Sequence, residues 1–214
     1  HPHRGIETIT YMIDGEVEHE DSLGNSGVIR TGDVQWMTAG SGIIHQEMPK
    51  KWKGMMQGFQ LWANLPASQK MMDPRYRDIK AGQIPVIEKS GFTVKLIAGK
   101  AYGGEGPVKD IVAKPEYMDI AVHEGNSGEI PVETGHTAFA YIFSGEVSFE
   151  PKGGKTHSAG EIVLFSDGEK VQFQSLNAPG RFLFISGKPL NEPVAWRGPI
   201  VMNTERELET AFRE

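Results

Sequence analysis

Residues 1–20, HPHRGIETITYMIDGEVEHE, decide the fold that this sequence predicts. From Gly5 to Ile13 the residues are mostly β-branched or aromatic, which is typical of a strand. Asp14-Gly15 follows, and this pair predicts a tight two-residue hairpin. Residues 16–20 return with alternating polar and apolar character, as a second strand does. The segment therefore predicts β structure from the first residues onward.

The second half of the chain repeats this pattern. Residues 141–150, YIFSGEVSFE, match residues 11–20 at the Tyr, Gly, Glu, Val and final Glu positions. Residues 159–165, AGEIVLF, align in the same order with residues 31–37, TGDVQWM. A repeat of this kind predicts two copies of one β fold. The 26 glycines and 13 prolines suit many short strands joined by tight turns.

The chain ends with a helix signal. In MNTERELETAFRE, Thr204 and Glu207 have the spacing of a capping box. Leu208 and Phe212 would share one face of that helix. We expect a short C-terminal helix that packs on a β surface.

Composition excludes several classes of protein. A net charge of −6 argues against a general electrostatic grip on nucleic acid or anionic lipid. The absence of cysteine rules out disulfides and thiolate metal sites, and permits a reducing cytosol. No apolar run approaches the roughly 20 residues of a membrane span. We therefore expect a cytoplasmic protein, nuclear as well in a eukaryote, with no membrane and no direct nucleic-acid partner.

Two short motifs carry residues that ligate metals. His1 and His3 are two positions apart, and so are His45 and Glu47. Side chains two apart on a strand point to one face, so two adjacent strands could converge three imidazoles and one carboxylate. These donors suit Fe, Mn, Ni, Cu or Zn better than Ca or Mg. Spacing alone leaves the alternative open, because histidine pairs of this kind also occur on ordinary surfaces.

The repeat bears on these candidates. At the corresponding offsets, Pro131 and Glu133 stand opposite the first pair, and Phe173 and Ser175 stand opposite the second. The second copy thus keeps the scaffold and loses the ligand types. If the metal site is confined to the first half of the chain, we expect one functional copy and one degenerate copy of the fold.

Taken together, the run HPHRGIET…TYMIDGEVEHEDSLGNSGVIRTGDVQWMTAGSGIIHQEMP resembles the pirin family, whose members are bicupins. The resemblance covers most of the first half, and DPRYRDIK and IPVI extend it. It implies an all-β bicupin, two antiparallel jelly-roll β-barrels packed together, with a short C-terminal helix. The glycine-rich stretch from Gly99 to Gly106 predicts a linker or an exposed loop, so we expect residues 1–105 to form a metal-binding barrel and residues 106–214 a degenerate barrel with the helix. Pirins also have strands before HPHRG, so we expect residues upstream of His1.

The resemblance also implies the ligands. His1, His3, His45 and Glu47 would hold one divalent transition metal, Fe(II) foremost, with Mn, Ni, Cu, Co or Zn as alternatives. The general cupin pattern would instead nominate Glu7, which we place beside the ligands as a pocket residue. Further candidates for the pocket wall, each also a plausible plain core residue, are Ile9, Tyr11, Trp36, Met37 and Phe59.

Several pirins resemble quercetin 2,3-dioxygenases, which open the flavonol ring with O₂. For this chain the resemblance implies a flavonol-like substrate, O₂, and Glu47 as the catalytic base. The alternative is a non-enzymatic, metal-dependent protein-binding module that acts as a transcription co-regulator. A structural metal is a third alternative, although structural sites usually close all coordination positions. We expect a monomer.

Overall fold

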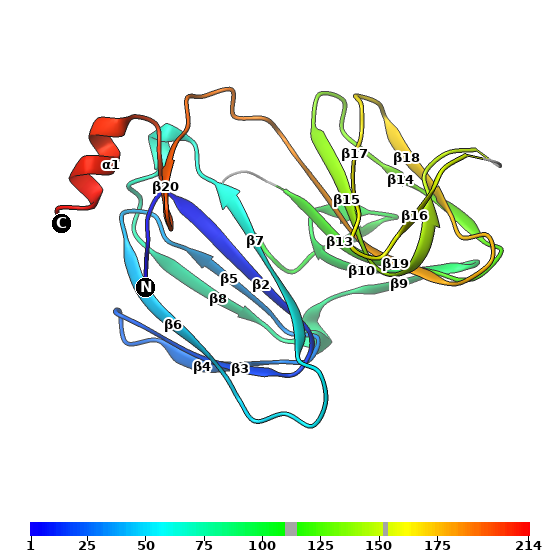
Figure 1. Ribbon diagram of the computed structural model, residues 1–214, viewed down its shortest axis with the longest axis horizontal. Coiled ribbons are helices and arrows are strands. Elements are labelled where there is room, and N and C mark those ends of the chain that lie inside the picture. Colours follow the sequence, from blue (N-terminus) through cyan, green and yellow to red (C-terminus); the bar gives the residue numbers. More distant parts are fainter. Residues whose placement is uncertain (110–114, 152–153) are drawn as a thin grey trace. The chain divides into compact units, whose positions relative to one another are not determined.

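The computed structural model describes residues 1–109, 115–151 and 154–214, and their contacts divide into two compact units. The first unit is His1–Gln83 with Leu190–Glu214, and the second is Ile84–Pro189. Strands dominate both, and one short α-helix lies near the C-terminus (Figure 1). The predicted all-β class with a C-terminal helix is confirmed. The predicted domain boundary between residues 105 and 106 stays a prediction.

Two antiparallel four-stranded sheets form most of the first unit. One has the order β1 (Pro2–His3), β6 (Ile43–Pro49), β3 (Glu16–Asp21), β4 (Ser26–Arg30). The other has the order β7 (Gln57–Asn64), β2 (Ile6–Asp14), β5 (Val34–Thr38), β8 (Arg75–Ile79). Two 3₁₀ turns, Ala67–Gln69 and Ala81–Gln83, complete this part.

The hairpin predicted at Asp14-Gly15 is wrong. β2 and β3 belong to different sheets, so the chain changes sheet at Gly15 instead of folding back on itself. Gly15 has φ +118°, and its N–H donates to Thr31 Oγ1 at 3.0 Å. A glycine at a positive φ is as typical of a sharp corner between sheets as of a hairpin, and sequence cannot separate the two.

The internal repeat is visible in the hydrogen bonds of each unit. Gly32 N–H donates to the carbonyl of Met12 at 2.7 Å, and Gly160 N–H donates to the carbonyl of Ile142 at 2.8 Å. A β-bulge follows each acceptor, in β2 after Met12 and in β15 (Thr137–Ser148) after Ile142. The matched sequence segments therefore build the same corner twice.

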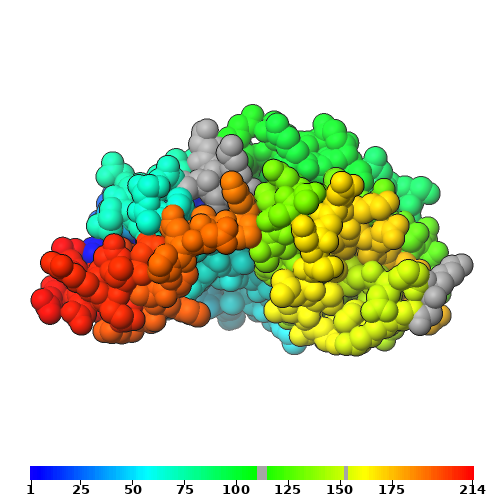
Figure 2. Space-filling view, turned by 90° about the horizontal axis from the view of Figure 1, so that it is seen from above, coloured from blue at the N-terminus to red at the C-terminus, as the bar shows by residue number. Residues whose placement is uncertain are grey.

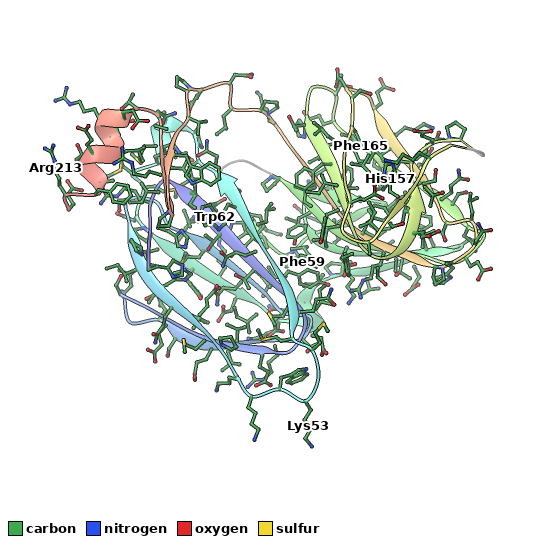
Figure 3. All side chains as sticks on the ribbon, viewed as in Figure 1. Lys53, Phe59, Trp62, His157, Phe165 and Arg213 are labelled. Atoms are coloured by element: carbon green, nitrogen blue, oxygen red, sulfur yellow. The ribbon has the colours of Figure 1, made fainter. Side chains whose placement is uncertain are left out.

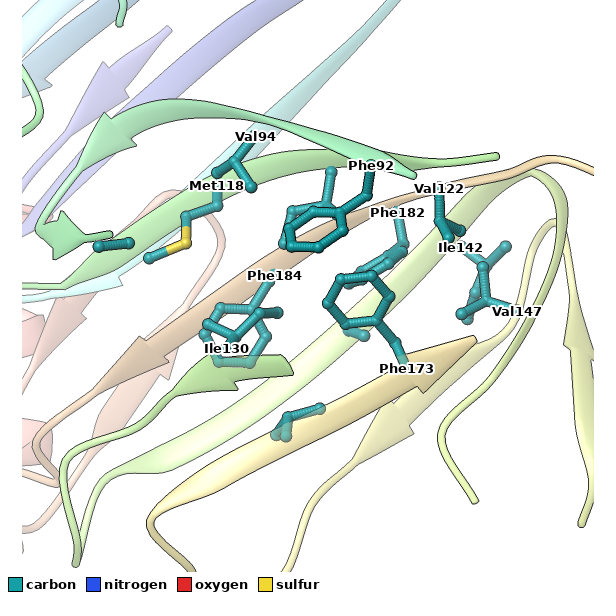
Figure 4. Packing of buried hydrophobic residues seen from close by; sticks show 14 of the residues in the cluster. Phe92, Val94, Met118, Val122, Ile130, Ile142, Val147, Phe173, Phe182 and Phe184 are labelled. Atoms are coloured by element: carbon teal, nitrogen blue, oxygen red, sulfur yellow. The ribbon is translucent and has the colours of Figure 1, made fainter. Parts of the chain in front are cut away.

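The second unit is one extended antiparallel sheet that curls around an apolar core. Its main path is β14 (Ser127–Pro131), β18 (Lys170–Gln174), β15 (Thr137–Ser148), β19 (Gly180–Gly187), β13 (Glu116–Val122), β10 (Phe92–Ala98), β9 (Val86–Lys89). β16 (Thr156–Ser158) and β17 (Ile162–Leu164) pair with β15, and β11 (Lys100–Ala101) pairs with β12 (Gly104–Glu105). Phe92, Phe173, Phe182 and Phe184 fill the centre (Figure 4). Phe173 meets Phe92 and Phe182 edge to face, the favoured arrangement of aromatic rings.

The end of the chain returns to the first unit. It forms β20 (Ala195–Arg197), β21 (Ile200–Met202) and α1 (Glu205–Ala211). Both halves of the predicted capping box are present, and Leu208 is buried against the hairpin residues Ala195, Ile200 and Met202. In Figure 2 the red C-terminal atoms lie close to the blue N-terminal ones. Both ends of the chain therefore meet beside β1, where the candidate ligands begin.

Candidate metal centre

Three imidazoles converge at the junction of β1 and β6. The strands pair antiparallel with His3 opposite Ile43, and the ladder continues through two main-chain bonds between His1 and His45. The Nε2 atom of His1 lies 3.0 Å from Nε2 of His3 and 3.0 Å from Nε2 of His45. One nitrogen from each ring lies within 4.8 Å of the other two. The structure thus brings three of the four predicted ligands together.

Burial keeps two of these rings neutral. His3 and His45 are buried, whereas His1 is exposed. Burial lowers the pKa of His3 below its ordinary value. Burial, followed by the repulsion that a protonated His3 would exert, lowers the pKa of His45 to about 4. A neutral imidazole is the form that ligates a metal, so these two rings need little deprotonation near neutral pH.

The hydrogen-bond partners fix which nitrogens are free. Nδ1 of His3 lies 3.2 Å from the carbonyl oxygen of Pro199, which can only accept, so Nδ1 carries the proton. Nε2 of His3 is then a lone pair that faces the cluster, an arrangement common for metal-bound histidines. In the described part of the chain, the buried Nδ1 of His45 has no hydrogen-bond partner.

The nitrogen separations fit an ion. Imidazole nitrogens about 2.1 Å from one ion are about 3.0 Å apart at a right angle and about 4.2 Å apart on opposite sides. The two 3.0 Å separations at His1 match adjacent octahedral positions. Hydrogen bonds between the rings explain the separations less well, because a single Nε2–H on His1 cannot point at both neighbouring nitrogens. The residues present therefore suit a divalent transition metal.

Glu47, the fourth predicted ligand, lies on β6 with His45 but is not part of the group of three histidines. Its Oε1 accepts from Thr10 Oγ1 at 2.9 Å, and its Oε2 accepts from Gln60 Nε2 at 2.9 Å. Gln60 is oriented in turn by the indole of Trp62, whose Nε1–H donates to Gln60 Oε1 at 3.0 Å. Trp62 also stands edge-on to His3, with ring centroids 5.2 Å apart. A closed set of hydrogen bonds thus holds the carboxylate next to the cluster.

Glu7 lies on the other face of β2 from this network. Thr10 on β2 reaches Glu47, and side chains alternate along a strand, so odd-numbered neighbours such as Glu7 point away. The regular strand needed to align Glu7 with His3 is broken at Gly5, where φ is +76° and β1 ends before β2 begins. Glu7 accepts from Thr38 Oγ1 at 2.6 Å, and burial raises the pKa of its carboxyl.

The predicted wall residues divide by the same alternation. Ile9, Tyr11, Trp36 and Phe59 lie on the face of Glu7, because Trp36 pairs with Ile9 and Phe59 pairs with Tyr11. Met37 pairs with Thr8, which also pairs with Trp62, and so lies on the face of the ligands. Phe59 and Trp62, both labelled in Figure 3, project from opposite faces of β7.

Sequence reasoning missed a third buried histidine, His19. His19 on β3 pairs directly with Glu47 on β6. Its ring stacks on Tyr76 at 4.7 Å, the Tyr76 hydroxyl lies 2.6 Å from Nδ1, and Nε2 is 3.8 Å from Asp78 Oδ2. Burial lowers the pKa of His19 and raises that of Tyr76. Strand alternation could have indicated this burial, because it places His19 on the same face of β3 as the apolar Val17, and both are buried while Glu18 between them is exposed.

Comparisons with known proteins show which sequences this chain is similar to. Residues 1–63 match the family model described as Pirin, and residues 117–214 match the model described as Pirin C-terminal cupin domain. The chain is 41% identical to a pirin-like protein of Solanum lycopersicum over all of its own length and 73% of that protein. It is 39% identical to the human protein Pirin, over 99% of this chain and 73% of that one.

Among solved structures, a quercetin 2,3-dioxygenase from Acinetobacter baumannii superposes with a TM-score of 0.93. It is 34% identical, and the match covers all of this chain and 75% of that one. The predicted bicupin fold is confirmed by this neighbour. Within the described residues, no helix has the length and apolarity needed to cross a membrane.

Proposed function

Because this chain belongs to the pirin family, we propose that it is a metal-dependent dioxygenase that opens the ring of quercetin-like flavonols with O₂. The observation that carries the proposal is the convergence of the nitrogens of His1, His3 and His45. It is supported by the likeness to a structure named as a quercetin 2,3-dioxygenase. Both oxygen atoms of O₂ would enter the ring-opened ester, on the two carbons that flank the hydroxyl-bearing carbon, and that carbon would leave as carbon monoxide with its own oxygen.

The three histidines would hold one divalent ion, Fe(II) foremost, with Glu47 as the fourth ligand. When bound, the metal would supply a Lewis acid with positions open to a flavonol oxygen and O₂. Burial of His3 and His45 restricts water at two of the ligands.

Glu47 would take the proton from the flavonol hydroxyl. Its carboxylate lies on the strand that carries His45, and both of its oxygens already accept hydrogen bonds, from Thr10 and Gln60. These bonds fix the direction of the carboxylate before a substrate arrives. Trp62, 37% exposed and edge-on to His3, offers a flat apolar surface to an aromatic ring.

Turnover of quercetin tests the proposal. Metal-free protein is loaded separately with Fe(II), Mn(II), Ni(II), Cu(II) or Co(II), and given quercetin in air. We expect loss of the flavonol absorption band, O₂ uptake and release of carbon monoxide in equal amounts. Absence of turnover with every metal, in protein shown to hold that metal, would reject the enzyme. It would favour the metal-dependent protein-binding module instead.

A further inference from the structure

We propose that the C-terminal hairpin β20–β21 is a working part of the metal centre, because the Pro199 carbonyl fixes His3 in the tautomer that can ligate. The contact joins residues 196 positions apart in the chain and within one compact unit. The inference rests on the proposed metal site, and it assigns a positioning role to a segment that carries no ligand itself.

The turn that presents this carbonyl is built to be rigid. Arg197 and Ile200 pair across it, and Gly198 has φ +55°. A glycine with positive φ at the first central position, followed by proline, is typical of a type II′ hairpin turn. The indole Nε1–H of Trp196 donates to the Gly198 carbonyl at 2.7 Å. The turn therefore holds the neighbouring Pro199 carbonyl at a defined position, where it accepts a hydrogen bond from His3.

Several contacts press the hairpin against the first strand. Arg4 and Ile200 form a parallel β-bridge, and Val201 N–H donates to the Arg4 carbonyl at 3.0 Å. The buried ammonium of Lys70 donates to the Gly5 carbonyl at 2.8 Å and to the Val201 carbonyl at 2.9 Å. A Cβ on Gly5 would stand 2.0 Å from the Val201 oxygen, so this approach requires glycine. The hairpin thus has one register next to His3.

The bond matters because neutral imidazole has two tautomers. Only the Nδ1–H form leaves the lone pair on Nε2, the atom that faces His1 in the cluster. Trp62 stands edge-on against the His3 ring, and Trp196 stands edge-on against Trp62 with centroids 6.3 Å apart. Partners that hold the outer nitrogen of a metal-bound histidine typically change metal affinity 10- to 100-fold when removed.

The first measurement needs no variant. In metal-free full chain labelled with ¹⁵N-histidine, long-range ¹H–¹⁵N correlation spectra distinguish the two tautomers of each ring. We expect His3 as the Nδ1–H form. Observation of His3 as the Nε2–H form would overturn the inference, whether or not the protein binds metal.

The second measurement weakens one acceptor. Replacing Ile200 by its α-hydroxy acid turns the Pro199–Ile200 amide into an ester, whose carbonyl is a poorer acceptor, and leaves every side chain in place. The ester also lacks the Ile200 N–H, a loss in β21 that the control below shares. We expect the Nδ1–H population of His3 to fall and the affinity for Co(II), followed by its visible absorption, to fall about 10-fold. The matched control is the same replacement at Met202, which weakens the Val201 carbonyl bonded to Lys70.

Equal effects of the two esters on tautomer and affinity would overturn the inference, because they would show a general loosening of β21. Failure of the proposed function looks different. Protein that binds Co(II) with the predicted tautomer but never degrades quercetin would reject the dioxygenase and leave the role of the hairpin standing.

Discussion

Replacing Lys70 by methionine should destabilise the first unit by about 3 kcal/mol, although the change removes a buried charge. Lys70 is 1% exposed, and its Nζ donates to the Gly5 carbonyl, Asn64 Oδ1 and the Val201 carbonyl at 2.8, 2.6 and 2.9 Å. All three N–H groups of the ammonium are therefore used. Methionine has similar length and leaves these three oxygens without a donor.

Two opposing free energies set the magnitude. Hydrogen bonds from a charged donor contribute about 1.5–3 kcal/mol each, so three contribute roughly 4.5–9 kcal/mol. Burial lowers the pKa of Lys70 from 10.5 to about 8. At about 1.4 kcal/mol per pKa unit, that burial costs roughly 3 kcal/mol, which the substitution recovers. The hydrogen bonds win, and the net loss is about 3 kcal/mol.

Urea denaturation followed by tryptophan fluorescence measures the loss of stability. Three of the four tryptophans of the first unit lie in its sheets and in the β20–β21 hairpin: Trp36, Trp62 and Trp196. Lys53→Met is the control, because Lys53 is exposed (Figure 3). A Lys70→Met variant within 1 kcal/mol of wild type would refute the reasoning and show that desolvation cancels the hydrogen bonds.

Three further outcomes are expected. Glu47→Gln should weaken Co(II) binding by isothermal titration and abolish quercetin loss; unchanged affinity with lost turnover would make the carboxylate a base only. The pKa of His45 is lowered to about 4 in the folded protein, against about 6.5 in the unfolded chain. At a pH below 6.5 the unfolded chain therefore binds more protons than the folded protein. Metal-free protein should therefore lose up to about 3 kcal/mol between pH 6.5 and 4, and His45→Asn should flatten that slope in denaturation curves. Gly27→Ala would place a Cβ 2.7 Å from His19 Nε2, so it should break the Tyr76–His19 bond and shift the His19 ¹⁵N resonances. Gly82→Ala, with open space at its Cβ and no positive φ, should not shift them.

The histidine cluster was predictable because it depends on local rules. Ligand types at i and i+2 on two short strands need only side-chain alternation and one antiparallel register to converge. His3 opposite Ile43 on the neighbouring strand supplies that register. The repeat was predictable for a similar reason, since Gly32 and Gly160 make the same turn in both copies.

The errors come from features that alternation cannot see. Gly5 and Gly15 both take positive φ and interrupt strands that read as continuous or as a hairpin. Glu7 therefore lost its alignment with His3. The contact of the Pro199 carbonyl with His3 could not be predicted from the sequence, because every residue has a backbone carbonyl and no residue type marks the one that accepts.

Four of the five predicted wall residues lie on the other face of the sheet from Glu47, and Met37 lies on the same face, for a physical reason that also supports the proposed site. Sequence reasoning put apolar side chains such as Tyr11 and Phe59 into the pocket, whereas the face of β2 and β7 toward Glu47 carries Thr10 and Gln60. A polar face turned inward is costly unless its groups are hydrogen-bonded.

Here the cost is offset by a network in which each donor has an acceptor. Trp62 donates to Gln60, and Gln60 and Thr10 donate to Glu47, so the carboxylate is satisfied before any ligand arrives. The neighbouring imidazoles differ, because the single proton on His1 cannot serve both adjacent nitrogens. A carboxylate whose hydrogen bonds are satisfied, beside imidazole nitrogens whose lone pairs converge, is what a site for a cation requires, and a core that only packs gains nothing from it.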